Sequence, residues 1–286
     1  VLESLCKVGA FDCFGLKRAQ LFGMIDASMA RAQQRVKDRE AGQGSLFDLL
    51  APEEGRPDDI PTPDVPEWEM RDLLRYEKEL LGFYVTGHPV DEYAEQIRIF
   101  QTDPLERVPL MAGDYGTRVG GFLAGVELKR TKKDSRSWAI LTLETRAASM
   151  ECLCFPDAYE ENLDALQPST PVLIEGYVSR REDDDRTRLV VNRVIPLGEA
   201  PALFTSEIHI HVRENTFEQD CAERIVEVCR RNPGETDVVV CAVCESGDMA
   251  FIQPPFRVRN TPELRAGIAD LLGADALKQK ANRERP

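Results

Sequence analysis

The sequence predicts a multidomain α+β protein with a helical N-terminal part, a β-barrel in the middle and a small α+β module at the end. Up to about residue 100, apolar residues recur at helical spacings of three or four, whereas from about Arg118 they alternate with a period of two. A proline-rich acidic stretch, Pro52–Pro66, interrupts the helical part and is typical of a stiff, solvated linker. After Pro201, strand-like and helical runs alternate.

The composition excludes a membrane protein and predicts a cytoplasmic one. A chain of 286 residues allows two or three domains, and its 42% hydrophobic content is enough for packed cores. No apolar run approaches the roughly 20 residues of a membrane span. Charged residues near the start (Glu3, Lys7 and Asp12) interrupt any signal-peptide core. We therefore expect no membrane partner.

The net charge of −14 argues against nucleic-acid binding unless the acidic excess is localised. Between Asp48 and Glu79 there are eleven acidic residues and four basic ones, so half of the excess lies in the linker and the helix that follows it. Basic surfaces elsewhere in the chain can therefore still bind phosphate.

The helical part contains a predicted helix from Leu16 to about Arg39 and two more at about 67–82 and 91–100. The second ends in an unusual run, E-K-E-L-L-G-F-Y-V-T-G-H-P, at Glu77–Pro89. Gly82 is suited to stop the helix, and Pro89 is suited to the first position of the next one. This run predicts a helix–turn–helix connector.

The middle part predicts five strands with a short helix, Pro156–Leu166, between the third and the fourth. This is the layout of the OB-fold barrel, and a β-sandwich would need more strands. Glycines at 120, 121, 125 and 176 suit the strong coiling of a small barrel.

The loop between the first two strands is strongly basic, with five cations between Lys129 and Arg136. OB-folds use this loop against oligonucleotides. If Ala139 and Leu141 face inward, Trp138 faces outward and can stack on a base. A solvated hairpin tip with a partly covered tryptophan is the alternative. The candidate DNA-binding residues are Lys129, Arg130, Lys132, Lys133, Arg136 and Trp138.

The last part predicts a β-α-β-β-α module with a helix at 217–231, followed by a disordered tail from Lys278 to Pro286. Its first helix has an acidic face, which would repel phosphate. The run Phe251–Phe256 offers apolar area for a protein partner. Its two prolines restrict the chain, so little conformational entropy is lost when the run binds.

We predict neither a metal site nor a catalytic residue. His209 and His211 alternate on one strand face, but no third ligand lies within sequence reach. Cys241 and Cys244 form a single C-x-x-C and are interpreted, with the other cysteines, as reduced buried thiols. No carboxylates are paired on strands as metal-dependent phosphoryl transfer requires.

Three segments together resemble one protein family. The Glu77–Pro89 run, the L-E-S-L and G-A-F-D runs between Leu2 and Asp12, and Arg18-Ala19 are similar to the alpha subunit of bacterial DNA polymerase III, a replicative C-family polymerase. The resemblance covers essentially the whole chain and begins far into the family's pattern, so we expect a C-terminal fragment.

The resemblance implies a domain order that we adopt as a prediction. It comprises the end of a helix-hairpin-helix region with a clamp-binding peptide (1–47), an acidic linker (48–66), a helical connector (67–103), an OB-fold nucleic-acid-binding domain (104–198) and a module similar to the family's tau-binding one (199–286).

The resemblance also implies the function. The parent would be a DNA-directed DNA polymerase, a nucleotidyltransferase that uses magnesium, with its catalytic aspartates upstream of Val1, so this fragment would hold no cofactor. Its partners would be single-stranded template, the sliding clamp, and the tau subunit of the clamp loader. A free-standing OB-fold protein that binds single-stranded DNA or tRNA is the alternative.

The candidate clamp peptide is Gln43-Gly44-Ser45-Leu46-Phe47. An extended peptide of this kind can bond backbone groups through Gln43 and bury Leu46 and Phe47 in an apolar cleft, with Ser45 as the small residue between them. The pattern alone favours the alternative, a loop whose L-F-D-L-L run starts a helix or packs on its own domain. The resemblance favours the clamp, because the family carries its internal clamp-binding peptide at this point.

Overall fold

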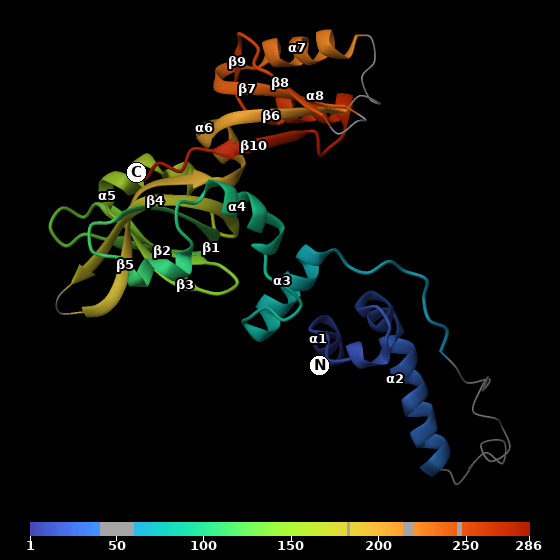
Figure 1. The fold of residues 1–286 in the computed structure, drawn as a ribbon. Coiled ribbons are helices and arrows are strands. Elements are labelled where there is room, and N and C mark those ends of the chain that lie inside the picture. The colour runs from blue at the N-terminus through green and yellow to red at the C-terminus, as the bar shows by residue number, and fades with distance from the viewer. Residues whose placement is uncertain (41–59, 182–183, 214–219, 245–247) are drawn as a thin grey trace. The chain divides into compact units, whose positions relative to one another are not determined.

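The computed structural model divides into two compact units, residues 1–89 and 90–286 (Figure 1). It describes residues 1–40, 60–181, 184–213, 220–244 and 248–286. The predicted clamp peptide at Gln43, Ser45, Leu46 and Phe47 therefore lies outside the described residues. Among the helices that are described, none is both long and apolar enough to cross a membrane.

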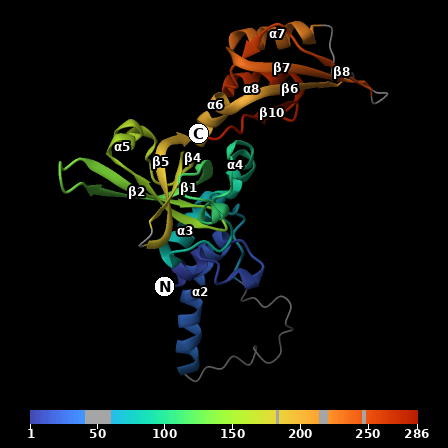
Figure 2. The same cartoon turned by 60° about the vertical axis from the view of Figure 1, so that its left-hand side comes forward.

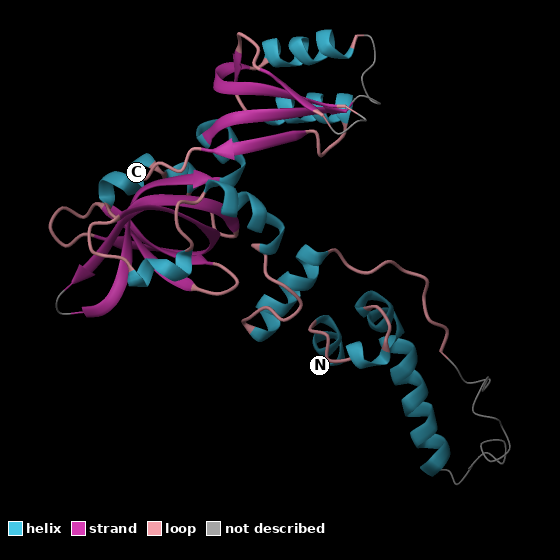
Figure 3. Cartoon of the chain, in the orientation of Figure 1, coloured by secondary structure: helices cyan, strands magenta, loops and turns pink. Residues whose placement is uncertain are grey.

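Unit 1 is helical and contains α1 (Leu2–Lys7), α2 (Arg18–Glu40) and α3 (Met70–Leu81) (Figure 3). The aromatic ring of Trp68 lies edge-on against those of Phe22 and Tyr76, with ring centroids 5.5 and 5.2 Å away. Helix α3 ends at Gly82, which has a φ of 84°, a left-handed conformation that favours glycine. The stop predicted from the sequence is thus present.

A buried ion pair explains the physical role of the Glu77–Pro89 run. The Glu77 side chain is fully buried and accepts a hydrogen bond of 3.0 Å from Nη1 of Arg18. The same carboxylate accepts the backbone N–H groups of Val85 and Thr86 at 2.7 and 3.0 Å. It therefore fixes the turn that follows α3 and ties it to the start of α2. Arg18 also contacts the carboxylate of Asp12 at 2.8 Å.

A second carboxylate caps the N-terminus of α2. Glu67 accepts the first N–H groups of this helix, from Arg18 at 2.7 Å and from Ala19 at 3.0 Å. These groups lack partners inside the helix, and a negative charge there also complements the helix dipole. Burial raises the pKa of Glu67, but the hydrogen bonds from Ala19, Trp68 and Arg18 outweigh it, so the pKa is lowered.

Unit 2 begins with a short helical segment, Asp91–Tyr93 and α4 (Ala94–Phe100), and continues into a barrel. Five of the described strands close in the order β1-β2-β3-β5-β4, with β3 and β5 parallel. Helix α5 (Pro156–Glu161) lies between β3 and β4 in the chain. The predicted five-stranded OB-fold barrel is confirmed. Its strands are β1 (Gly116–Arg130), β2 (Ser137–Glu144), β3 (Ser149–Cys154), β4 (Thr170–Arg181) and β5 (Asp184–Pro196).

The barrel core follows the alternation in the sequence. On β2, Ala139, Leu141 and Leu143 are fully buried, as expected for an inward-facing set. A Cβ at Gly176 would lie 2.0 Å from the carbonyl oxygen of Val190, so only glycine permits β4 and β5 to approach this closely.

The second part of unit 2 is a sheet in the order β10-β6-β7-β8, with β9 paired to β7 (Figure 2). Helices α7 and α8 pack on one face of it, where they share an apolar core with Ile208, Ile210 and Val212 of β6. The elements are α6 (Ala200–Phe204), β6 (Thr205–Arg213), α7 (Cys221–Arg231), β7 (Pro233–Val243), β8 (Met249–Ile252), β9 (Arg257–Val258), α8 (Pro262–Leu272) and β10 (Leu277–Ala281).

The expectation of a disordered tail from Lys278 to Pro286 is wrong. Strand β10 pairs antiparallel with β6, and the residues after it contact the barrel part of the unit. Buried Arg118 of β1 donates from Nη2 to the carbonyl oxygen of Asn282 at 2.7 Å and from Nε to that of Phe100 at 2.7 Å. The sequence does not indicate an ordered tail, because β10 is a polar strand at the edge of the sheet and is held mainly by backbone hydrogen bonds.

Candidate nucleic-acid interface

The β1–β2 hairpin places the predicted basic loop and Trp138 on the same side of the barrel wall. In the antiparallel register, Lys129 lies opposite Trp138, so both side chains point to the same face. That face is the outer one, because the next residue along β2, Ala139, is fully buried. The hairpin extends beyond the rest of the barrel (Figure 2).

Trp138 has an aromatic neighbour that sequence analysis missed. Its ring stacks on that of Phe155, with centroids 5.9 Å apart and an interplanar angle of 27°. Phe155 follows β3 directly, and its ring is available to solvent because the residue is 42% exposed. Its position two residues after outward-facing Leu153 was the signal that could have identified it. The two rings form an aromatic pair next to the basic loop.

The tip of the hairpin is closed by its own hydrogen bonds. The N–H of Thr131 donates to the carbonyl oxygen of Arg136 at 2.9 Å, and the N–H of Arg136 donates to the Thr131 hydroxyl at 3.0 Å. The same hydroxyl donates to the carboxylate of Asp134, which lowers the pKa of that carboxyl. The loop therefore has a defined shape, with Lys132 and Lys133 exposed at its turn.

The predicted cations differ in their surroundings. Arg130, Lys132 and Lys133 are exposed, whereas Lys129 is half-buried and forms an ion pair with Glu127. Arg136 contacts Asp157 and Glu160 of α5 at 2.7 and 3.0 Å, and the hydrogen bonds to these two carboxylates raise its pKa. Arg136 thus links the hairpin to α5, and its contact with DNA stays a prediction.

The structure brings a thiol beside the two histidines of β6. The ligand atoms of His209, His211 and Cys241 all lie within 4.8 Å of one another. Sequence spacing could not reveal this cluster, because it depends on the parallel pairing of β6 with β7, which sets Cys241 opposite His211. Burial, followed by the charge of Glu207, raises the pKa of Cys241, and burial lowers that of His211.

The eight cysteines, all within the described residues, are free. Cys241 is buried, as the sequence predicted, but Cys244 and Cys13 are exposed, so the interpretation as buried thiols is wrong for these two. Cys244 directly follows Val243, the last residue of β7.

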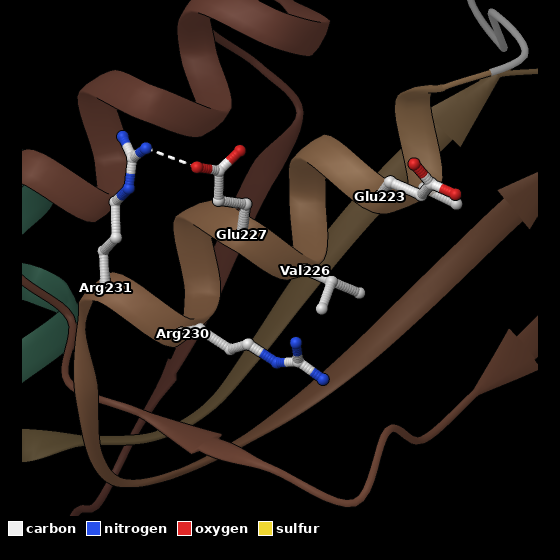
Figure 4. A pocket seen from close by; sticks show the side chains of 6 residues that line it. Glu223, Val226, Glu227, Arg230 and Arg231 are labelled. Carbon is white, nitrogen blue, oxygen red and sulfur yellow. Dashed lines mark hydrogen bonds and ion pairs between the residues drawn. The ribbon is translucent and has the colours of Figure 1, made fainter.

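Helix α7 presents a shallow groove on its exposed side (Figure 4). Glu223 and Glu227 lie along it, but Arg230 and Arg231 occupy the last turn, where Arg231 pairs with Glu227. Cations at this end complement the helix dipole. The described part of this helix is therefore mixed in charge rather than uniformly acidic.

Strand β8, in contrast, is an exposed apolar edge. It pairs with β7, and Met249, Phe251 and Ile252 are each more than half exposed. An exposed apolar edge strand is a template for pairing with another chain.

Comparison with known proteins agrees with the geometry of the barrel. Residues 119–197 match a family described as an OB-fold nucleic acid binding domain. Over nearly its whole length the chain is also similar to proteins named DNA polymerase III subunit alpha.

The chain is 28% identical over 283 residues to the subunit of Vibrio cholerae, and the aligned region covers 98% of this chain and 23% of the relative. It is 32% identical over 288 residues to that of Mycobacterium tuberculosis, covering 97% of this chain and 24% of the relative. For Pasteurella multocida the identity is 25% over 279 residues, with shares of 96% and 24%. The chain thus spans about a quarter of the length of these relatives. Along almost all of its own length, the chain belongs to the family of the DNA polymerase III alpha subunits.

Proposed function

We propose that this chain is the part of a bacterial replicative DNA polymerase that holds single-stranded template and connects the enzyme to the sliding clamp and the clamp loader. The observation that carries the proposal is the basic hairpin tip beside the Trp138–Phe155 pair on the outer face of the barrel. The polymerase reaction, with its magnesium ions, would be performed by other parts of the full-length cytoplasmic enzyme, and we assign no catalytic residue to this chain.

The hairpin and the adjoining Phe155 together offer the two interactions that proteins commonly use to bind single strands, phosphate contacts and base stacking. Exposed Arg130, Lys132 and Lys133 can neutralise phosphates, while the aromatic pair offers a ring on which a base can stack. Phosphate contacts release counterions, so the affinity must fall as the salt concentration rises. The net charge of −14 opposes binding at long range. We therefore expect weak, salt-dependent binding that supports a polymerase already held on its template.

The proposal is tested by fluorescence anisotropy with the whole chain and three labelled ligands: a thymidine oligonucleotide, a DNA duplex and a tRNA. The oligonucleotide should bind best, with an affinity that falls steadily as salt is added. Preferential binding of tRNA would instead favour a free-standing OB-fold tRNA binder. The absence of oligonucleotide binding even at low ionic strength would refute the proposed role of the barrel.

The clamp contact is proposed on the resemblance and on the peptide sequence. A synthetic peptide spanning Gly42–Leu49 should bind a bacterial sliding clamp. Replacing Gln43, Leu46 and Phe47 by alanine should abolish binding, because the apolar pair supplies the buried area and Gln43 the register. Calorimetric titration of the clamp with both peptides measures this. Equal binding by the two peptides would refute the contact.

The clamp-loader contact is proposed for the exposed edge of β8. Its exposed side chains offer apolar area, and β8 is the last strand in the described sheet order, so a strand of a partner such as the tau subunit can pair with its edge. Phe251→Asp should therefore weaken tau binding by the whole chain at least about tenfold, since burying a charge at an apolar contact costs more than 1.4 kcal/mol. Surface plasmon resonance with immobilised tau measures it.

Phe14→Asp is the matched control for the tau experiment, because Phe14 is 67% exposed, close to the 63% of Phe251, but lies in unit 1. It should leave tau binding unchanged. Tau binding that survives Phe251→Asp intact would exclude β8 as the docking edge.

A further inference from the structure

The face of the C-terminal sheet that is turned away from α7 and α8 carries two imidazoles and a thiol. The alternation of β6 directs His209 and His211 to the side opposite its core residues. Strand β7 runs parallel to β6 with Cys241 in register with His211, so the thiol lies on the same side. The ligand atoms of the three residues lie within 4.8 Å of one another.

The spacing matches a tetrahedral metal centre. With metal–nitrogen bonds of about 2.0–2.1 Å and a metal–sulfur bond of about 2.3 Å, a nitrogen and a sulfur ligand of one zinc ion lie about 3.5 Å apart. The Sγ atom of Cys241 lies 3.6 Å from Nδ1 of His209. This pair already spans one edge of such a tetrahedron without movement of the strands, and rotation of the imidazoles can close the other distances.

A neighbouring carboxylate orients the first imidazole. Nε2 of His209 is hydrogen-bonded to Oε1 of Glu207, two residues earlier on the same strand. When Nε2 carries the proton, its N–H donates a hydrogen bond to this carboxylate. The lone pair of Nδ1 then points toward Cys241. A carboxylate that holds the far nitrogen of a ligating histidine is the usual support of a metal-bound imidazole.

We propose that His209 Nδ1, His211 and Cys241 Sγ bind a Zn²⁺ ion between β6 and β7, with Glu207 as a positioning residue. Two imidazoles and a thiolate select zinc over magnesium or calcium, which prefer oxygen ligands. The fourth position is available to water or to a ligand from a partner. The amino group of Lys278, opposite His209 on β10, opposes a further positive charge, and the carboxylate of Glu207 and the thiolate offset it. Bound metal would join the two central strands of the module next to the exposed β8 edge.

The test is a titration of the tag-free, metal-free whole chain with Co²⁺, followed by displacement with Zn²⁺. We expect one equivalent of Co²⁺ to bind with the visible bands of a tetrahedral complex and a thiolate-to-cobalt charge-transfer band. Zn²⁺ should displace it stoichiometrically. Cys241→Ser should remove the charge-transfer band, and His209→Asn and His211→Asn should each lower the affinity at least about tenfold. Glu207→Gln should lower it about 10- to 100-fold while the band persists.

The chain offers matched controls in unit 1. His88→Asn changes the remaining histidine, which lies edge-on against the ring of Tyr84, and Cys13→Ser changes an exposed thiol. Both should bind Co²⁺ as the wild type does, and far-ultraviolet circular dichroism should show every variant folded. The proposal is overturned if the charge-transfer band is absent from the wild type or persists in a folded Cys241→Ser chain. In either case the thiol of Cys241 serves only as a hydrogen-bond donor to His209.

Discussion

Replacing Glu77 by alanine is expected to destabilise unit 1 by about 3–5 kcal/mol, the usual cost of removing one partner from a buried ion pair. The substitution deprives Arg18 of one carboxylate and leaves the N–H groups of Val85 and Thr86 without their acceptor. The loss in the free energy of unfolding is measured by urea titration, with the fluorescence of Trp68 as the signal. The measurement uses a Trp138→Phe background, which leaves one tryptophan in the chain.

Glu79→Ala provides the control for this experiment. Glu79 stands on the same helix and has the same charge, but its side chain is exposed. Its replacement should change the free energy of unfolding by less than about 0.5 kcal/mol. Equal effects of the two substitutions would show that the Glu77 contacts contribute no special stability.

The Glu77 carboxylate also makes the stability of unit 1 depend on pH. Burial raises the pKa of Glu77, but the hydrogen bonds from Thr86, Val85 and Arg18 outweigh it, so the folded-state pKa is lowered. A lowered carboxyl pKa means that its stabilisation is present above the unfolded value of about 4.3 and is lost as the pH falls through the folded value. Unit 1 should therefore lose stability below about pH 4, and Glu77→Gln should reduce this loss.

Reversing the charges of the hairpin is expected to abolish most binding of single-stranded DNA. Each phosphate contact contributes about 0.7 to the slope of log affinity against log salt for single strands. Changing Lys129, Arg130, Lys132 and Lys133 to glutamate should therefore flatten the slope by up to about 3. Anisotropy at several salt concentrations measures both the affinity and the slope.

The control variant has the same net charge but leaves the hairpin intact. It reverses four exposed cations elsewhere, namely Lys37, Arg71, Arg230 and Arg231. Long-range repulsion is then matched, so only local contacts distinguish the two proteins. Equal losses of affinity in both variants would show that the hairpin makes no specific phosphate contacts.

The barrel could be predicted from the sequence because its signals are local. Alternation along β2 identifies Ala139, Leu141 and Leu143 as core and Trp138 as outward-facing, and all of this follows from a period of two within one strand. The basic loop is also continuous in sequence. Local patterns such as these need no knowledge of which strands pair.

The contacts that could not be predicted join distant residues. Arg18 and Glu77 are 59 positions apart, so neither residue carries a local sign of its partner. The stacking of Phe155 on Trp138 depends on the β2–β3 register, and the approach of Cys241 to His209 depends on a parallel crossover. The tail was misjudged for a related reason, since β10 gains its order from backbone bonds to β6.

The fluorescence of Trp138 tests most directly whether the hairpin face of the barrel binds single-stranded DNA. In a Trp68→Phe chain, Trp138 is the remaining tryptophan, and its ring lies beside Phe155 on the outer face. A thymidine oligonucleotide should quench its emission saturably, with added salt reversing the effect and with the hairpin charge-reversal variant showing none. An oligonucleotide that binds by anisotropy but leaves the Trp138 emission unchanged would place the nucleic acid elsewhere and contradict this account.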